Sequence, residues 1–168
     1  MTNRHAEWRL MTSDDIPEVD AIGKVAHPDF PEDIAVVENR QALFPQGCFV
    51  AEGQNRLLGY AISHPSTIGE PAPLDTIIAL PENADCLFLH DIALSDDARR
   101  LGLGSRIVPL LKKTALKNGL DKLGLVSVNN SLGFWQSQGF ATLSPNEKLK
   151  AKLKSYGSDA AYMVLKIA

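Results

Sequence analysis

Residues 87–105, LFLHDIALSDDARRLGLGS, predict a strand, a glycine-bearing turn and the start of a helix in immediate succession. The strand-like apolar run ends at Leu94, and an apolar pattern of helical spacing begins at Ser105. The first N–H groups of a helix have no intrahelical partner and carry partial positive charge, and glycine lets an anion approach them closely. With Arg99 and Arg100 adding positive charge beside it, this turn is typical of a phosphate-binding site.

The spacing of the glycines limits which phosphate this turn would bind. A P-loop has four residues between its glycines and then Lys-Ser/Thr, whereas a single residue separates Gly102 from Gly104. The dinucleotide-binding motif needs a third glycine at the position of Ile107. Both motifs are therefore excluded, which leaves a different pyrophosphate site or a tight turn into a core helix without a ligand.

Two motifs together resemble one enzyme family. The pattern Arg99-x-x-Gly102-x-Gly104 is similar to the pyrophosphate-binding signature of the GNAT acyltransferases, Arg/Gln-x-x-Gly-x-Gly/Ala. Residues 129–140, NNSLGFWQSQGF, resemble the later element of that family: an Asn, a short helix carrying an aromatic residue, and a Gly-Phe pair. The motifs occur in the family's order, and the resemblance covers roughly residues 6–167.

This resemblance implies an α/β (α+β) GNAT fold, with a mixed, mostly antiparallel central sheet that splays at the strand of residues 86–94 and helices on both faces. The residues themselves point the same way, because strand-like and helix-like segments are mixed rather than strictly alternating. A chain of 168 residues, 45% hydrophobic and 22% charged, is large enough for one globular domain, which we expect to span residues 1–168.

Local patterns predict where the elements begin and end. We expect strands at residues 7–11, 48–52, 57–63, 86–94, 122–128, 139–143 and 160–167, and helices at about 14–26, 34–43, 105–116 and 131–138. Pro109 removes a backbone hydrogen bond from its helix and is expected to bend it. Residues 64–85, rich in proline and polar side chains, are expected to form a long surface connection.

Charge and cysteine content exclude several classes of protein. The net charge of −3 gives no electrostatic footprint for nucleic acid or an acidic membrane surface. No apolar run approaches the ~20 residues of a membrane span, and the first ten residues lack the apolar centre of a signal peptide. Cys48 and Cys86 lie in apolar runs and are interpreted as buried, reduced thiols. We therefore expect a cytoplasmic protein without a metal, a nucleic-acid partner or a membrane.

By the family resemblance, the cofactor is acetyl-coenzyme A (acetyl-CoA), acting as co-substrate. The residues implied at its pyrophosphate are Arg99, Arg100, Leu101, Gly102, Leu103, Gly104 and Ser105. The pantetheine arm is implied to pair with the main chain of Ile92, Ala93 and Leu94, as an added strand would. The N–H of Leu94 is expected to donate to the thioester oxygen and to stabilise the oxyanion of the tetrahedral intermediate.

Two residues of the second motif are expected near the coenzyme. Asn130 is implied as a side-chain contact, with an N-cap of the following helix as its alternative role. Trp135 stands four residues before the Gly-Phe pair, where many family members have the tyrosine that protonates the departing thiolate. An indole N–H cannot act as a general acid, so Trp135 is expected to pack against the thiol end of the coenzyme. The tyrosines that could replace it, which the sequence does not rank, are Tyr60, Tyr156 and Tyr162.

His90 is the candidate general base, because an alkyl amine is mostly protonated at pH 7 and must lose a proton before it attacks. A histidine ordinarily titrates near pH ~6.5, which suits this task. Arylalkylamine-type members of the family carry two histidines on this strand; His90 matches one, and Phe88 stands at the other position. A buried core histidine is the alternative interpretation. Asp91 is expected to face away from His90 in a structural role, and His64 to lie across from His90.

We therefore expect an N-acetyltransferase that moves an acetyl group from acetyl-CoA to the primary amine of a small molecule, by direct attack in a ternary complex. The acceptor is expected between residues 27–32, 44–46 and 64–75, whose acidic and aromatic side chains fit a cationic amine. A protein or peptide N-acetyltransferase and a non-catalytic sensor that binds acyl-CoA are the alternatives. The resemblance also makes a homodimer reasonable.

Overall fold

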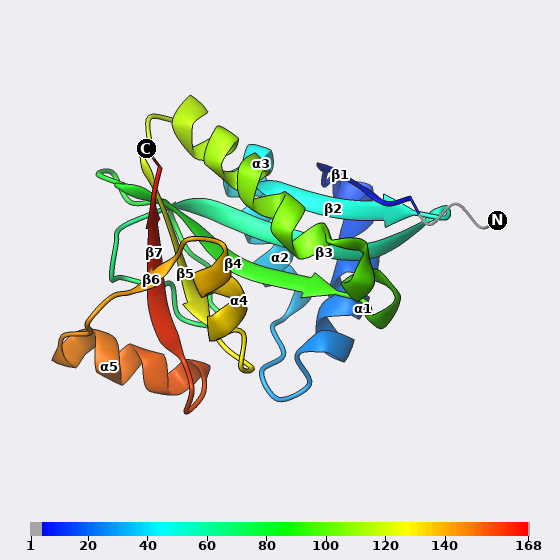
Figure 1. The fold of residues 1–168 in the computed structure, drawn as a ribbon. Helices are drawn as coiled ribbons and strands as arrows, with labels where there is room; N and C mark the ends of the chain where they lie inside the picture. The colour runs from blue at the N-terminus through cyan, green and yellow to red at the C-terminus, as the bar shows by residue number, and fades with distance from the viewer. Residues whose placement is uncertain (1–4, 168) are drawn as a thin grey trace.

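Seven strands form one mixed sheet in the computed structural model, which describes residues 5–167. The strands are β1 (Glu7–Leu10), β2 (Cys48–Gly53), β3 (Arg56–Ser66), β4 (Cys86–Leu94), β5 (Lys122–Ser127), β6 (Ala141–Thr142) and β7 (Ala161–Lys166). Their order across the sheet is β1-β2-β3-β4-β5-β7-β6 (Figure 1). Strands β4 and β5 run parallel and the other neighbours antiparallel, which confirms the predicted mixed, mostly antiparallel sheet.

Helices cover both faces of this sheet, as predicted (Figure 1). They are α1 (Ile16–Ala26), α2 (Ile34–Leu43), α3 (Leu103–Lys117), α4 (Leu132–Ser137) and α5 (Glu147–Leu153). On one face, α1 and α2 pack against a cluster around Tyr60 and Ile62. On the other, Ile107 and Leu111 of α3 pack with Trp135 of α4 and the outward side chains of β4 and β5. Within residues 5–167, no helix has both the length and the apolar character needed to cross a membrane.

The parallel pair β4–β5 opens into a splay. Its ladder joins residues 87–89 to residues 123–125, whereas the antiparallel ladder of β4 with β3 continues to Leu94. Residues 90–94 therefore carry a main-chain edge that is paired on the β3 side and turned toward the gap on the β5 side. The predicted splay lies at this strand. Residues from both faces of the sheet line the gap, such as His27 at the end of α1 and Trp135 of α4.

A β-bulge interrupts β4 at His90. Ile62 of β3 pairs with Asp91 and the next residue, Ser63, pairs with Leu89, so His90 is an extra residue opposite a single step of β3. His90 and Asp91 consequently both face α1 and α2: His90 contacts Glu32, and Asp91 contacts His27. The prediction that Asp91 faces away from His90 is wrong, because side chains alternate strictly only along a regular ladder.

Two further predictions about the elements need correction. Strand β6 has two residues rather than the five expected, because the N–H groups of Gly139 and Phe140 hydrogen-bond to the last carbonyls of α4. Helix α5 was not predicted, although Asn146 caps it through Leu149 N–H at 2.8 Å. Pro109 lies inside α3, as predicted, and the helix continues through it to Lys117.

A long segment connects β3 to β4, as predicted, but it spans residues 67–85 rather than 64–85 because β3 continues to Ser66. It is fastened to α2 and to the residues before that helix. The side chain of Asn39 exchanges two hydrogen bonds with the main chain of Ile78, and Arg40 Nη1 donates to the carbonyl of Thr76 at 2.8 Å. The N–H of Asp75 donates to Glu32 Oε2 at 2.8 Å. This connection therefore holds the side chain of Glu32 from one side.

The start of α1 is held by Asp15. Its carboxylate accepts two hydrogen bonds from the guanidinium of Arg9, at 2.8 and 2.9 Å, and one from the N–H of Thr12 at 2.8 Å. These donors, above all Arg9, lower the pKa of Asp15 from its ordinary 3.8 even though burial raises it. The pair fastens β1 to the first turn of α1.

Asp15→Asn is expected to lower the free energy of unfolding by about 1–2 kcal/mol, the usual cost of weakening a helix cap and a charged hydrogen bond. Because the pKa of Asp15 is lowered by folding, the difference is complete at pH 7 and fades as the pH falls below 3.8. Urea denaturation measures it, with exposed Asp14→Asn as the control of equal charge change. An equal loss in both variants would contradict this role of Asp15.

Candidate active site

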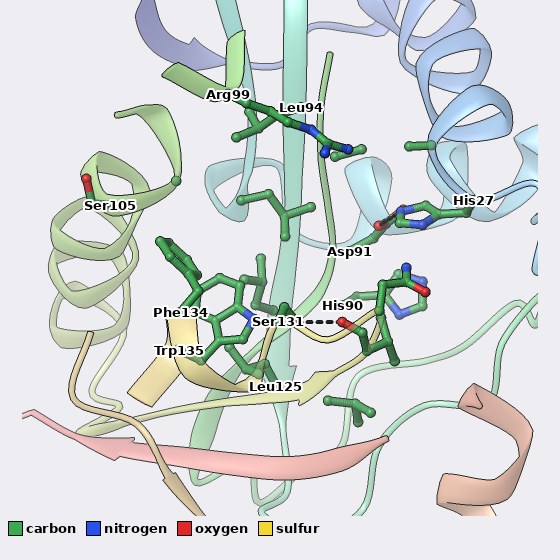
Figure 2. Close-up of a pocket in the computed structure, with 18 of the residues that line it drawn as sticks. His27, His90, Asp91, Leu94, Arg99, Ser105, Leu125, Ser131, Phe134 and Trp135 are labelled. Atoms are coloured by element: carbon green, nitrogen blue, oxygen red, sulfur yellow. Dashed lines mark hydrogen bonds and ion pairs between the residues drawn. The ribbon is translucent and has the colours of Figure 1, made fainter. Parts of the chain in front are cut away.

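A cavity of about 550 Å³ lies at the splay, between β4, the end of β5, the start of α3 and helix α4. Figure 2 shows Phe134 and Trp135 on one side of it and His27 with Asp91 on the other. Arg99 and Leu94 lie toward one end and His90 toward the other. The cavity therefore extends from the glycine turn along the free edge of β4 to the bulge.

Most of the predicted site residues line this cavity. They are His90, Ile92, Ala93, Leu94, Arg99, Gly102, Gly104, Ser105 and Trp135. Arg100 and Leu101 instead line a second cavity of about 470 Å³, and the side chain of Leu103 is fully buried. Asn130 is not among the lining residues; its N–H donates to Asp159, and its neighbour Asn129 contributes to the wall.

The glycine turn ends the cavity at the N-terminus of α3. Gly102 has a φ of +70°, a conformation that glycine adopts without strain. The first helical hydrogen bond runs from Arg106 N–H to the carbonyl of Gly102, so the N–H groups of residues 103–105 precede the helical ladder. Gly104 lies against Phe134, because a Cβ there would be 3.1 Å from Phe134 Cζ. Such a turn offers main-chain donors to a phosphate at close approach.

His90 is paired with a carboxylate from the segment that joins α1 to α2. Its Nε2 lies 2.8 Å from Glu32 Oε1, and its side chain is 1% exposed. Burial raises the pKa of Glu32, but the hydrogen bonds from His90 and from the N–H of Asp75, together with the nearby charge of Arg40, outweigh it, so the net pKa is lowered and Glu32 is ionised at neutral pH. An ionised Glu32 accepts a proton from Nε2, which leaves the lone pair of the neutral ring on Nδ1. Nδ1 is buried and has no hydrogen-bond partner among residues 5–167.

A second imidazole–carboxylate pair lies beside the first. His27, the residue that ends α1, has its Nε2 2.8 Å from Asp91 Oδ1. The other carboxylate oxygen accepts the hydroxyl hydrogen of Tyr60 at 2.6 Å. The hydrogen bond to Asp91 raises the pKa of His27 despite its partial burial.

The contacts of Glu32 with His90, and of His27 and Tyr60 with Asp91, were not predicted from the sequence. Glu32 and His27 fall within the segment expected to form the acceptor wall, but Glu32 and His90 are 58 positions apart in the chain. The β-bulge at His90 brings the two side chains together, and its position depends on strand pairing that a single sequence does not reveal. An aspartate next to a histidine inside an apolar strand was the available signal, because such a carboxylate needs a partner.

The indole of Trp135 is buried between two other aromatic rings. It meets Phe134 and Phe140 edge-on, with ring centroids 4.8 and 5.5 Å apart. Two of the three tyrosines considered as replacement acids lie elsewhere: Tyr156 donates to the carbonyl of Ala72, and Tyr162 stacks on a core phenylalanine. Tyr60 contacts the site through Asp91, but burial raises its pKa well above 10, so it stays a phenol.

Three further titratable side chains are buried in neutral form. Burial raises the pKa of Cys48 and of Cys86 to about 12, which excludes both as thiolate nucleophiles near neutral pH. His64 lies opposite Phe88 rather than His90, because the bulge shifts the register. Its ring centroid is 6.3 Å from that of His90, and burial lowers its pKa to about 4.

A sequence profile described as the Acetyltransferase (GNAT) family matches residues 13–140. None of the curated proteins is significantly similar in sequence. N-acetylglutamate synthase from Neisseria gonorrhoeae, complexed with coenzyme A and N-acetyl-glutamate, has a TM-score of 0.72 at 21% identity; the match covers 98% of this chain and 35% of that one. The chain thus spans about a third of that enzyme's length.

Two other solved structures match over nearly their whole length. The GphF GNAT-like decarboxylase, in complex with isobutyryl-CoA, has a TM-score of 0.80 at 13% identity over 96% of this chain and 100% of its own. The ribosomal-protein-S18-alanine N-acetyltransferase from Escherichia coli has a TM-score of 0.68 at 20% identity over 98% and 95%. These structures establish the shared fold, and the sequence profile establishes the family. The chain therefore belongs to the acetyltransferase (GNAT) family, a family of acyl-CoA-dependent N-acetyltransferases.

Proposed function

We propose that this chain transfers an acetyl group from acetyl-CoA to the primary amine of a small molecule, by direct attack within a ternary complex. One observation carries the proposal: a single cavity joins the glycine turn at the start of α3 to His90 along the free edge of β4. The two ends of that cavity offer different chemistry. One end can hold a pyrophosphate, and the other can accept a proton.

The glycine turn and the edge of β4 are the proposed binding site for the coenzyme. The pyrophosphate would lie on the N–H groups of Gly104 and Ser105, with Arg99 able to swing toward it because its side chain is exposed. The N–H of Ser95 donates to Leu58 on β3 at 2.8 Å. Because N–H directions alternate along a strand, the N–H of Leu94 points to the splay. That orientation supports Leu94 as a donor to the pantetheine or thioester oxygen.

His90 is the proposed general base. Glu32 holds its Nε2–H, so Nδ1 is the atom that takes the proton from the ammonium group of the acceptor. The buried and unpartnered state of Nδ1 supports this role, since an unsatisfied buried nitrogen is costly unless a ligand uses it. Both cysteines are buried as neutral thiols, which supports direct attack over an acyl-enzyme route.

A small amine is the proposed acceptor. Residues 67–85 are bound to Glu32 and α2 on the face where the acceptor would arrive, which supports a narrow access to His90. Glu32 and Asp91 place two carboxylates near that access, which favours a cationic group. A protein or peptide amine is the alternative acceptor, and structural neighbours include the NatC complex bound to Gag peptide and CoA.

Release of free thiol from acetyl-CoA across a panel of acceptors tests this function. The panel contains 2-phenylethylamine, spermidine, glutamate and a tripeptide with a free α-amine. We expect at least one small amine to raise thiol release about tenfold or more above the acceptor-free rate, in line with general-base assistance of a bound amine. Release with the tripeptide alone would favour a peptide acetyltransferase. Calorimetric binding of acetyl-CoA without release for any acceptor would favour the sensor.

A further inference from the structure

The departing thiolate of coenzyme A needs a proton, and the cavity wall restricts where that proton can come from. Trp135 occupies the position expected for a proton donor, and its indole N–H does not titrate in water. Among the described residues that line the cavity, the ionisable side chains are His27, His90, Asp91 and Arg99. An arginine guanidinium does not give up its proton in proteins, so it is not a general acid. The donor must therefore be sought among the two histidines and Asp91.

The hydrogen bonds of these three groups separate their roles. Asp91 accepts hydrogen bonds on both oxygens, from His27 and from Tyr60, so it acts as a carboxylate acceptor. His90 lines the cavity, its Nδ1 is buried without a hydrogen-bond partner among residues 5–167, and its side chain is 1% exposed. His27 has a side chain that is 23% exposed, so it can exchange protons with solvent between turnovers. Of the two histidines, His27 is therefore the better placed to deliver a proton repeatedly.

We infer that His27 is the general acid that protonates the departing coenzyme A thiolate, in the role that Trp135 cannot perform. The inference rests on the transferase function proposed above. Asp91 orients the imidazole through Nε2, and Tyr60 holds Asp91 from the other side. Nδ1 is the ring nitrogen that Asp91 leaves free, so it carries the proton that is transferred.

The proton balance of this step is complete. The acceptor ammonium loses one proton to His90 before attack and a second to water as the tetrahedral intermediate collapses. The carbon–sulfur bond breaks with its electron pair on sulfur, and sulfur takes the Nδ1 proton of the His27 imidazolium. After the products leave, the His90 imidazolium loses its proton to solvent and His27 regains one from solvent. Each turnover thus forms one amide and one thiol and releases one proton.

The charges around His27 set the pH range in which it can act. Asp91 on β4 and Glu32 before α2 both favour the imidazolium, and together they outweigh burial, so the pKa of His27 is raised above 6.5. Asp20 and Lys24, on its own helix, form an ion pair with each other at 2.7 Å. A general acid works only while protonated, so kcat should fall as the pH rises through the pKa of His27. Titration of the acceptor amine has the opposite effect on rate.

His27→Gln tests the assignment, because the amide can still donate to Asp91 but cannot titrate. With the best small amine of the panel, we expect kcat to fall about 100-fold, the lower range for general acid catalysis, while KM for acetyl-CoA stays unchanged. The alkaline fall in kcat should disappear in this variant. Asp91→Asn should keep that fall but move it to lower pH, because the imidazolium loses its counter-charge. His5→Gln, at an exposed histidine outside the cavity, is the matched control.

Each outcome decides the question. An alkaline fall that persists in His27→Gln, or a rise in KM without a fall in kcat, would show that His27 only fastens α1 to β4. If His27→Gln does not fold, an unshifted alkaline fall in Asp91→Asn overturns the assignment. A wild-type protein that releases no thiol with any amine refutes the transferase, and this inference with it. If the wild-type protein releases thiol and His27→Gln still shows the alkaline fall in kcat, the transferase function stands and only the role of His27 is refuted.

Discussion

Gly104→Glu is expected to abolish acetyl-CoA binding, with a loss of at least about 100-fold in affinity. The substitution places a carboxylate at the second helical position of α3, beside the N–H groups proposed for the pyrophosphate. Like charges at about 4 Å cost roughly 4 kcal/mol near a protein surface, more than the ~2.7 kcal/mol that corresponds to 100-fold. Titration calorimetry with coenzyme A and acetyl-CoA measures this effect directly.

Two matched variants separate charge from shape in this experiment. Gly104→Ala adds a Cβ 3.1 Å from Phe134 Cζ, and Phe134 is partly exposed and can move by a few tenths of an ångström. We expect it to weaken binding only a few-fold. Asn118→Glu adds the same charge at the opposite, exposed end of α3 and should leave affinity unchanged. Affinity retained by Gly104→Glu would refute the pyrophosphate site.

His90→Gln is expected to lower kcat by about 100- to 1000-fold while KM for acetyl-CoA changes little. Glutamine can still pair with Glu32, so the bulge keeps a partner, but an amide nitrogen does not accept a proton as an imidazole does. The acidic fall in kcat, which reports protonation of the base, should disappear with the histidine. Initial rates from pH 5 to 9 with the best amine of the panel provide this profile.

Glu32→Gln tests His90 through the carboxylate that pairs with it. The amide no longer fixes which ring nitrogen of His90 carries hydrogen, and it removes the counter-charge of the imidazolium. We expect kcat to fall about tenfold, the cost usual for a supporting residue, and the acidic fall to move to lower pH. Glu70→Gln, an exposed carboxylate in the same connection, is the control. A profile with an unchanged acidic fall in both His90→Gln and Glu32→Gln would exclude His90 as the base.

The parts of the fold that depend on neighbouring residues could be predicted from the sequence. The strand, turn and helix of residues 86–117 were expected because apolar period, glycine position and cap chemistry all act within a few residues. Helix α5 was missed although Asn146, Leu149 and Leu153 carry its cap and buried face. The segment is rich in lysine and has only two buried apolar positions. Two positions are too few to give a clear helical pattern, so no helix was predicted there.

The parts of the site that depend on register could not be predicted. His90 was placed on the correct strand, but the side to which Asp91 points depends on one extra residue in β4. The bulge is set by the pairing of β3 with β4, which no local pattern encodes. The Glu32–His90 and His27–Asp91 contacts follow from it, so both pairs became visible only with the three-dimensional structure.

One carboxylate oxygen of Glu32 accepts a hydrogen bond from the N–H of Asp75, in the segment between β3 and β4. The other oxygen accepts one from His90. Turnover is therefore open to improvement by laboratory evolution at positions that do not line the cavity. Substitutions at residues 74–78 would alter how firmly Asp75 holds that carboxylate, and so the rate, without reshaping the cavity. A library restricted to cavity-lining positions would overlook them, whereas one that randomises this short stretch should yield both faster and slower enzymes.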